Sequence, residues 1–190
     1  MSDRGLVCVE RKRLVDEPGI VGRVLALGEE LVVFSLISDD IQPNGFVVLR
    51  VADITSVRSP APHAAFKEKV LAVRGRAPRF AAPSKPLSWR SLIDHAAPRW
   101  PLLAIYTEVK KPDVLFIAQV SKMSLEGATV STRLVAPGGI WNKRQKVFRM
   151  ADITRIDFGG RYEEALAIAL GLLPKARKKK TTSRKSTRTR

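Results

Sequence analysis

The chain has 190 residues, with 34 Lys and Arg against 18 Asp and Glu, and a formal net charge of +16. This length suits one large or two small domains, and a hydrophobic fraction of 45% is typical of a globular rather than a disordered protein. No apolar run is long enough to span a bilayer, charges appear too early for a signal peptide, and the single Cys8 excludes an internal disulfide, so we expect a cytoplasmic protein with no membrane partner.

The first unit, residues 1–73, is predicted to be a small β-barrel followed by a helix. Its apolar runs are rich in β-forming residues. Asn44-Gly45 between two such runs predicts a hairpin turn, because both residues tolerate positive φ. Phe66, Val70 and Val73 have helical spacing. The expected strands span residues 6–9, 20–27, 31–37, 46–51 and 55–57, with one 3₁₀ turn at 52–54.

A linker is predicted between the two units. Residues 74–87 are basic and rich in proline, a composition typical of connecting segments. After them, residues 88–97 predict a short helix that Ser88 or Ser91 caps and Pro98 ends.

The second unit, residues 88–173, is predicted to repeat the strand plan of the first. Its expected strands span residues 102–109, 114–123, 129–135, 141–150 and 155–158. Pro137-Gly138-Gly139 is the expected turn between the third and fourth of these strands. A helix is expected from Arg161, and its apolar positions form one stripe that is typical of core packing.

An internal repeat relates the two units. Ala-Asp-Ile-Thr occurs at residues 52–55 and again at 151–154, and in both places an amphipathic stretch follows. A repeat of this length indicates one folding unit used twice. Units of this size are near the lower limit for a self-sufficient core, so we expect the two halves to pack on each other.

Five short strands, a 3₁₀ turn before the last strand and an appended helix resemble a small SH3-like or Sm-like barrel. The second half, with Tyr106-Thr107-Glu108, Trp141 and residues 152–166, is also similar to a group of uncharacterised bacterial proteins with tandem barrels of this kind. The resemblance implies a mainly β (α+β) architecture and no particular function, because one fold hosts many functions. The acidic-x-apolar-x-Asn segment and the Arg-Gly pair with which Sm proteins bind RNA are absent. Ring assembly and uridine binding are therefore not implied.

Most of the positive charge lies outside the two units. Residues 74–90 carry 5 basic residues and residues 174–190 carry 9, and neither segment has an acid, so together they hold 14 of the 16 net charges. The tail, residues 174–190, is too polar to bury a core and is predicted to be disordered. Runs of Lys and Arg without acids attract polyanions, because binding releases condensed counterions.

Two sets of residues are candidate nucleic-acid contacts. Trp141 beside the three cations Lys143, Arg144 and Lys146 could stack a base and hold phosphates, and a rim Trp beside solvated charges is the alternative. The tail cations would grip the phosphate backbone without reading sequence, and a purely solubilising tail is the alternative. The linker cations expected to help are Arg74, Arg76, Arg79, Lys85 and Arg90. The tail candidates are Lys175, Arg177, Lys178, Lys179, Lys180, Arg184, Lys185, Arg188 and Arg190.

The sequence contains no pattern typical of catalysis. His63 and His95 lack metal-ligand spacing with another His or Cys, and phosphate-binding loops and nucleophile elbows are absent. Several carboxylates could be grouped as a catalytic cluster, but no partner base accompanies them. Positions on a hairpin rim and in turn caps explain these carboxylates. These carboxylates are Asp39, Asp40, Asp53, Asp152 and Asp157. We therefore expect no enzyme, no cofactor and no metal.

Two functions are consistent with these features. The first is a non-enzymatic nucleic-acid-associated protein whose basic tail and linker contact the phosphate backbone of DNA or RNA. The second is a protein-interaction module, because SH3-like barrels bind peptides in grooves or along an exposed strand edge. In that case the basic tail would serve solubility.

Overall fold

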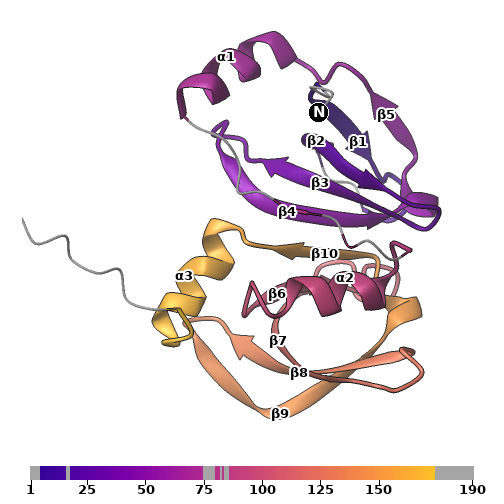
Figure 1. Cartoon of the computed structure of the whole chain (residues 1–190), viewed down its shortest axis with the longest axis vertical. Helices are drawn as coiled ribbons and strands as arrows, with labels where there is room; N and C mark the ends of the chain where they lie inside the picture. Colours follow the sequence, from indigo (N-terminus) through magenta and orange to yellow (C-terminus); the bar gives the residue numbers. More distant parts are fainter. Residues whose placement is uncertain (1–4, 16–17, 75–79, 82, 84–85, 174–190) are drawn as a thin grey trace, which may run out of the picture.

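In the computed structural model, the described residues of the chain form ten antiparallel strands and three α-helices (Figure 1). The structure describes residues 5–15, 18–74, 80–81, 83 and 86–173. The tail predicted at residues 174–190 and most of the predicted linker lie outside the described residues. All ten strands belong to one sheet, in the order β5-β1-β2-β3-β4-β10-β6-β7-β8-β9. The expected mainly β class is therefore confirmed. None of the described helices is long and apolar enough to cross a membrane.

The first half follows the predicted element order, with one turn in a different place. It contains β1 (Val7–Glu10), β2 (Ile20–Leu27), β3 (Leu31–Ile37), β4 (Pro43–Arg50), the 3₁₀ turn η1 (Val51–Asp53), β5 (Ser56–Arg58) and α1 (Ala64–Arg74). The predicted turn at Asn44-Gly45 is wrong, because both residues lie in β4. The chain reverses between Ser38 and Gln42, where the amide of Ser38 donates to the carbonyl of Gln42 over 3.0 Å. Ile41 takes a positive φ of 55° in this turn.

Helix α1 forms where predicted but does not bury the expected positions. Phe66 and Val73 are 60% and 89% exposed, whereas Leu71 is buried. Leu71 packs with Leu6 and Cys8 at the β1 end of the sheet. The helix therefore contacts the strands along a narrow line through Leu71, and the stripe through Phe66 faces away.

The second half repeats the strand order of the first. It contains α2 (Trp89–Ala96), β6 (Leu103–Tyr106), β7 (Leu115–Met123), β8 (Thr129–Ala136), β9 (Ile140–Arg149), η2 (Met150–Asp152), β10 (Arg155–Phe158) and α3 (Arg161–Ala169). Both predicted caps of α2 act together, since the amide of Ser91 donates to the Ser88 hydroxyl and the amide of Ser88 donates to the Ser91 hydroxyl. The order β10-β6-β7-β8-β9 matches β5-β1-β2-β3-β4, as the repeat predicts.

The two halves are joined by strand pairing. β4 pairs with β10, with Leu49 opposite Arg155 and Phe46 opposite Phe158. Within each half the last strand pairs with the first strand, β5 with β1 and β10 with β6. Among the described strands β4 does not pair with β5, so the sheet is not closed. Two separate tandem barrels are therefore not confirmed.

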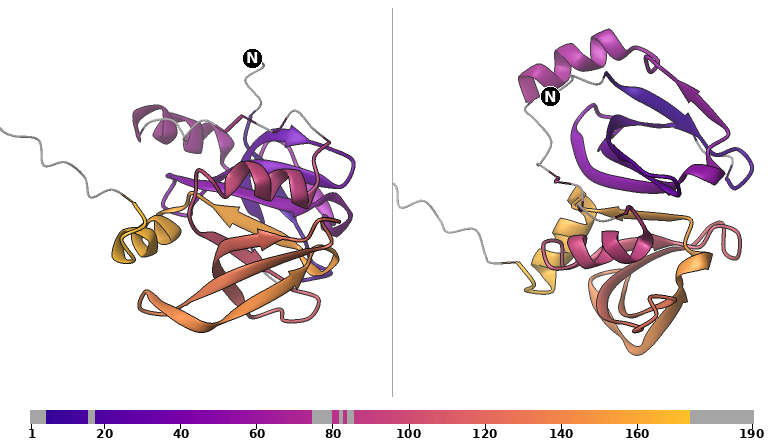
Figure 2. Two further views of the ribbon diagram at one scale, coloured as in Figure 1. Left: turned by 60° about the horizontal axis from the view of Figure 1, so that its bottom comes forward. Right: turned by 45° about the vertical axis from the view of Figure 1, so that its right-hand side comes forward.

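One hydrophobic core spans both halves. Leu92 and Ile93 of α2 pack in a cluster with Val48 of β4 and with Ile156 and Phe158 of β10. All five side chains are at most 1% exposed. α2 lies beside the junction of the halves, whereas α1 lies at the end of the first half that is remote from the second (Figures 1 and 2).

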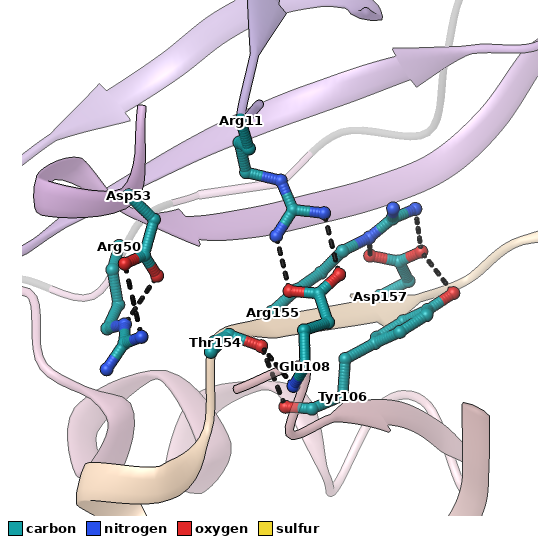
Figure 3. A network of polar contacts seen from close by, with 8 residues as sticks. All are labelled: Arg11, Arg50, Asp53, Tyr106, Glu108, Thr154, Arg155 and Asp157. Atoms are coloured by element: carbon teal, nitrogen blue, oxygen red, sulfur yellow. Dashed lines mark hydrogen bonds and ion pairs between the residues drawn. The ribbon is translucent and has the colours of Figure 1, made fainter. Parts of the chain in front are cut away.

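A buried polar network also crosses the junction (Figure 3). Arg11, which follows β1, donates to both carboxylate oxygens of Glu108 over 2.5 and 2.7 Å. Both side chains are 2% exposed. The amide of Glu108 donates to the Thr154 hydroxyl, which donates to the carbonyl of Tyr106. The two charges neutralise each other in the interior, so this network links the halves rather than forming an open site.

Candidate nucleic-acid interface

The hairpin of β8 and β9 is strongly basic. Residues 129–149 contain five cations and no acid, a charge of +5. The equivalent hairpin of the first half, residues 31–50, contains Asp39, Asp40 and Arg50, a charge of −1. The two hairpins occupy the same place in the strand order of their halves. The fold itself therefore does not require the positive charge of the second hairpin.

The β9 cations lie on an open edge of the sheet. Among the described strands β9 pairs with β8 alone, whereas its counterpart β4 is covered by β10. Lys143, Arg144 and Arg149 are exposed. Within the described part of the chain, no carboxylate forms an ion pair with any of these three. Their charge is therefore available to an anionic partner.

Trp141 carries a cation on one face of its ring. The Cζ atom of Arg133 lies 4.4 Å from the centroid of the Trp141 ring, a cation–π contact. The pairing of β8 with β9 shifts between Arg133 and Val135, and Trp141 lies opposite Val135. Trp141 is half-buried and packs on the cluster formed by Val135, Leu166 and neighbouring residues, while Arg133 is exposed.

A hollow of about 390 Å³ opens beside this stacked pair. Ligand pockets commonly fall between about 300 and 1,000 Å³. Only aromatic, amide and cationic side chains line it, with no carboxylate, so it presents positive potential and hydrogen-bonding groups together. The lining residues are Arg133, Trp141, Asn142, Lys143, Arg144 and Gln145, and we call this feature the hairpin hollow.

Lys146 lies on the face of β9 opposite to that of its neighbour Gln145, and it has an unusual environment. Its Nζ atom lies 3.6 Å from the ring centroid of Phe116 and 5.1 Å from that of Phe148. Burial and then the nearby charge of Lys111 lower the pKa of the Lys146 amine below its usual value. The strand register makes Val47 its counterpart in the first half, because Thr132 lies opposite Lys146 as Phe34 lies opposite Val47.

The structure brings together three of the four site residues predicted on a folded unit. Trp141, Lys143 and Arg144 all line the hairpin hollow. Two of the predicted linker cations have local partners instead. Arg74 donates to the carbonyls of Asp40 and Ile41, and Arg90 donates to the carbonyl of Leu125 over 2.7 Å. The remaining linker and tail candidates lie outside the described residues. They are Arg76, Arg79, Lys85, Lys175, Arg177, Lys178, Lys179, Lys180, Arg184, Lys185, Arg188 and Arg190.

Sequence reasoning missed Arg133 and Arg149. Charge counted over a whole unit conceals them, because the acids of the second half lie outside residues 129–149. A count by hairpin would have found the acid-free stretch. The contact between Arg133 and Trp141 had no sequence signal, since the two extra residues that β9 holds between Trp141 and Gln145 decide which side chains meet.

Two of the suspected carboxylates are engaged by arginine side chains. Asp53 accepts from Arg50 over 2.6 Å, and Asp40 accepts from Arg161 over 2.9 Å. Arg161 and Ser38 lower the pKa of the Asp40 carboxyl to about 2. Among the described residues there is no group of three or more His, Cys, Asp or Glu side chains that could hold a metal ion.

Fold resemblance alone would in any case leave the function open, because similar folds perform different tasks. Comparisons of the chain with protein-family models, with curated proteins and with solved structures found no match. The resemblance to SH3-like and Sm-like barrels therefore stays an expectation, and the hairpin itself supplies the functional argument.

Proposed function

We propose that this chain is a non-enzymatic nucleic-acid-associated protein that contacts the phosphate backbone without reading sequence. The observation that carries the proposal is the acid-free hairpin at residues 129–149, because its counterpart in the same molecule has the opposite charge sign. Lys143, Arg144 and Arg149 lie exposed along one strand, and such a row can follow a chain of phosphates. The nine cations of residues 174–190 add to this charge.

The mechanism is electrostatic and predicts a steep salt dependence. Each phosphate that a cation neutralises releases condensed counterions into solution. If the hairpin and tail together neutralise about 5 to 8 phosphates, the plot of log affinity against log salt concentration has a slope of roughly −4 to −7. A flat dependence contradicts the mechanism.

The test is a titration of fluorescently labelled duplex DNA and single-stranded RNA across several salt concentrations. Three proteins are compared: the full chain, the chain ending at Leu173, and the full chain with Lys143→Gln and Arg144→Gln. We expect both altered proteins to bind more weakly and with shallower salt slopes, because each phosphate that is no longer neutralised reduces the slope by about one unit. The matched control is Lys67→Gln with Lys69→Gln on α1, which removes the same charge from the other half. An equally large effect in this control would show a response to net charge alone.

A protein-interaction module is the second candidate function. The unpaired edge of β9 favours it, because an extended peptide can add as a further strand to such an edge. A captured protein that survives both nuclease treatment and deletion of residues 174–190 would support this function. Loss of that protein after either treatment would argue for nucleic acid as the link.

A further inference from the structure

The stacked pair of Arg133 and Trp141 has a geometry suited to a flat ligand. A guanidinium is planar and can stack on an aromatic ring, which leaves its other face open to a ligand. The Cζ atom of Arg133 lies 4.4 Å from the Trp141 ring centroid, and Arg133 is both exposed and part of the lining of the hairpin hollow. Trp141 is held in place by its packing on the core. The pair therefore offers an exposed planar group over a ring that the core holds in place.

The groups around this surface match the chemistry of a nucleotide. Asn142 and Gln145 line the hollow, and their amides can both donate and accept hydrogen bonds, as the edges of nucleobases require. Lys143 and Arg144, in the same lining, can bind the flanking phosphates.

The first half of the molecule shows that folding does not require these residues. Arg133 lies opposite Gln145 in the register of β8 and β9. The equivalent pair in β3 and β4 is Ser35 opposite Phe46, and both of these side chains are buried. Where the first half fills this position with core, the second half leaves a polar hollow that opens to solvent.

We propose that the Arg133–Trp141 pair is a stacking surface for one unpaired nucleobase, so that the hairpin hollow binds single-stranded nucleic acid in preference to duplex. The inference rests on the proposed function and adds a contact with a base to the contacts with phosphate. Bases inside a duplex are covered on both faces by their neighbours, whereas an unstacked base offers a free face to an arginine plane.

The test compares two single-stranded DNA oligonucleotides of equal length, one with bases and one fully abasic. Both carry the same phosphates, so the basic tail and the exposed lysines contribute equally to each. We expect the full chain to bind the base-bearing strand roughly 5- to 100-fold more tightly, as base stacking on proteins commonly gives. Equal affinity for the two strands would overturn the inference and leave the backbone mechanism standing. Absence of binding to both would overturn the proposed function itself.

Two charge-conserving variants locate the effect. Arg133→Lys keeps the charge but loses the planar guanidinium, so it should weaken binding of the base-bearing strand several-fold and leave binding of the abasic strand unchanged. Arg144→Lys is the matched control in the same lining and should preserve the preference for bases. A preference that survives Arg133→Lys, in a variant whose thermal unfolding matches the wild type, would also overturn the inference.

Discussion

At the scale of single residues, the Arg11–Glu108 pair takes two charges out of water at the junction of the halves. Burial raises the pKa of the Glu108 carboxyl, but hydrogen bonds from Arg11 and Thr154 and the charge of Arg11 outweigh it, so the pKa lies below its ordinary value of 4.5. The folded state therefore favours the ionised carboxylate more than the unfolded state does. The stability from this pair is complete above pH 4.5 and is lost as the pH falls through the lowered pKa.

The first prediction concerns Glu108→Gln, which leaves the Arg11 guanidinium buried without its counter-ion. We expect the free energy of unfolding at pH 7 to fall by about 3–5 kcal/mol. Urea denaturation at a series of pH values from 7 to 3 measures this free energy. The difference in the free energy of unfolding between wild type and variant should narrow below pH 4.5. The double variant Arg11→Met with Glu108→Leu is the control. It should recover most of the loss, because buried pairs are often replaceable by apolar residues. A gap that stays constant with pH would contradict this role.

At the scale of elements, the start of β4 shows why the sequence indicated a turn where none forms. Gly45 does take a positive φ of 76°, which is the property that made Asn44-Gly45 a turn signal. The glycine is needed for a different reason. A Cβ built on Gly45 would lie 2.5 Å from the carbonyl carbon of Gly159 and from the carbonyl oxygen of Phe158. The Asn-Gly signal was correct about the positive φ of Gly45. The reason for the glycine is the close approach of Gly159, 114 residues further along the chain, and no local sequence pattern reports such a contact.

The second prediction tests this close approach with Gly45→Ala. The substitution combines unfavourable φ with a backbone clash at the β4–β10 junction, so we expect it to lower the free energy of unfolding by about 2–4 kcal/mol. Gly138→Ala is the matched control, because Gly138 has a φ of 85° and no atom within 4 Å of the added Cβ. It should cost about 1–2 kcal/mol, the φ term alone. Equal losses in denaturant melts would show that β4 and β10 can separate locally to accept the methyl group.

At the scale of the whole molecule, the sequence predicted the individual strands and helices better than the way in which the two halves join. The strand at residues 31–37 and both caps of α2 are confirmed, because alternation and capping are local signals. The pairing of β4 with β10 joins residues about one hundred positions apart, and either strand alone resembles any buried strand. The Trp141 environment was only half predictable, since the residue and its cationic neighbours are adjacent in sequence but Arg133 comes from another strand.

The third prediction is that both halves unfold together. α2 and the shared core cross the junction, so separating the halves would expose apolar side chains of both. All three tryptophans, Trp89, Trp100 and Trp141, lie in the second half. Tryptophan fluorescence therefore reports the second half, and far-ultraviolet circular dichroism reports the whole chain. We expect the two thermal transitions to coincide. A second dichroism transition without a fluorescence change would show that residues 1–73 unfold independently.

The two open edges of the ten-stranded sheet show the value of holding both units in one chain. In a homodimer built from a single such unit, the covered inner strand and the free edge strand would have the same sequence. A lysine at the Val47 position would then be present on both strands, including the one that the partner covers. The tandem chain has no such constraint. Val47 is fully buried on the inner strand β4 beside β10, while Lys146 occupies the corresponding place on the edge strand β9. The first copy of the repeat can thus keep an apolar strand at the junction while the second copy changes its exposed strand. Mutations in the two copies can be selected separately.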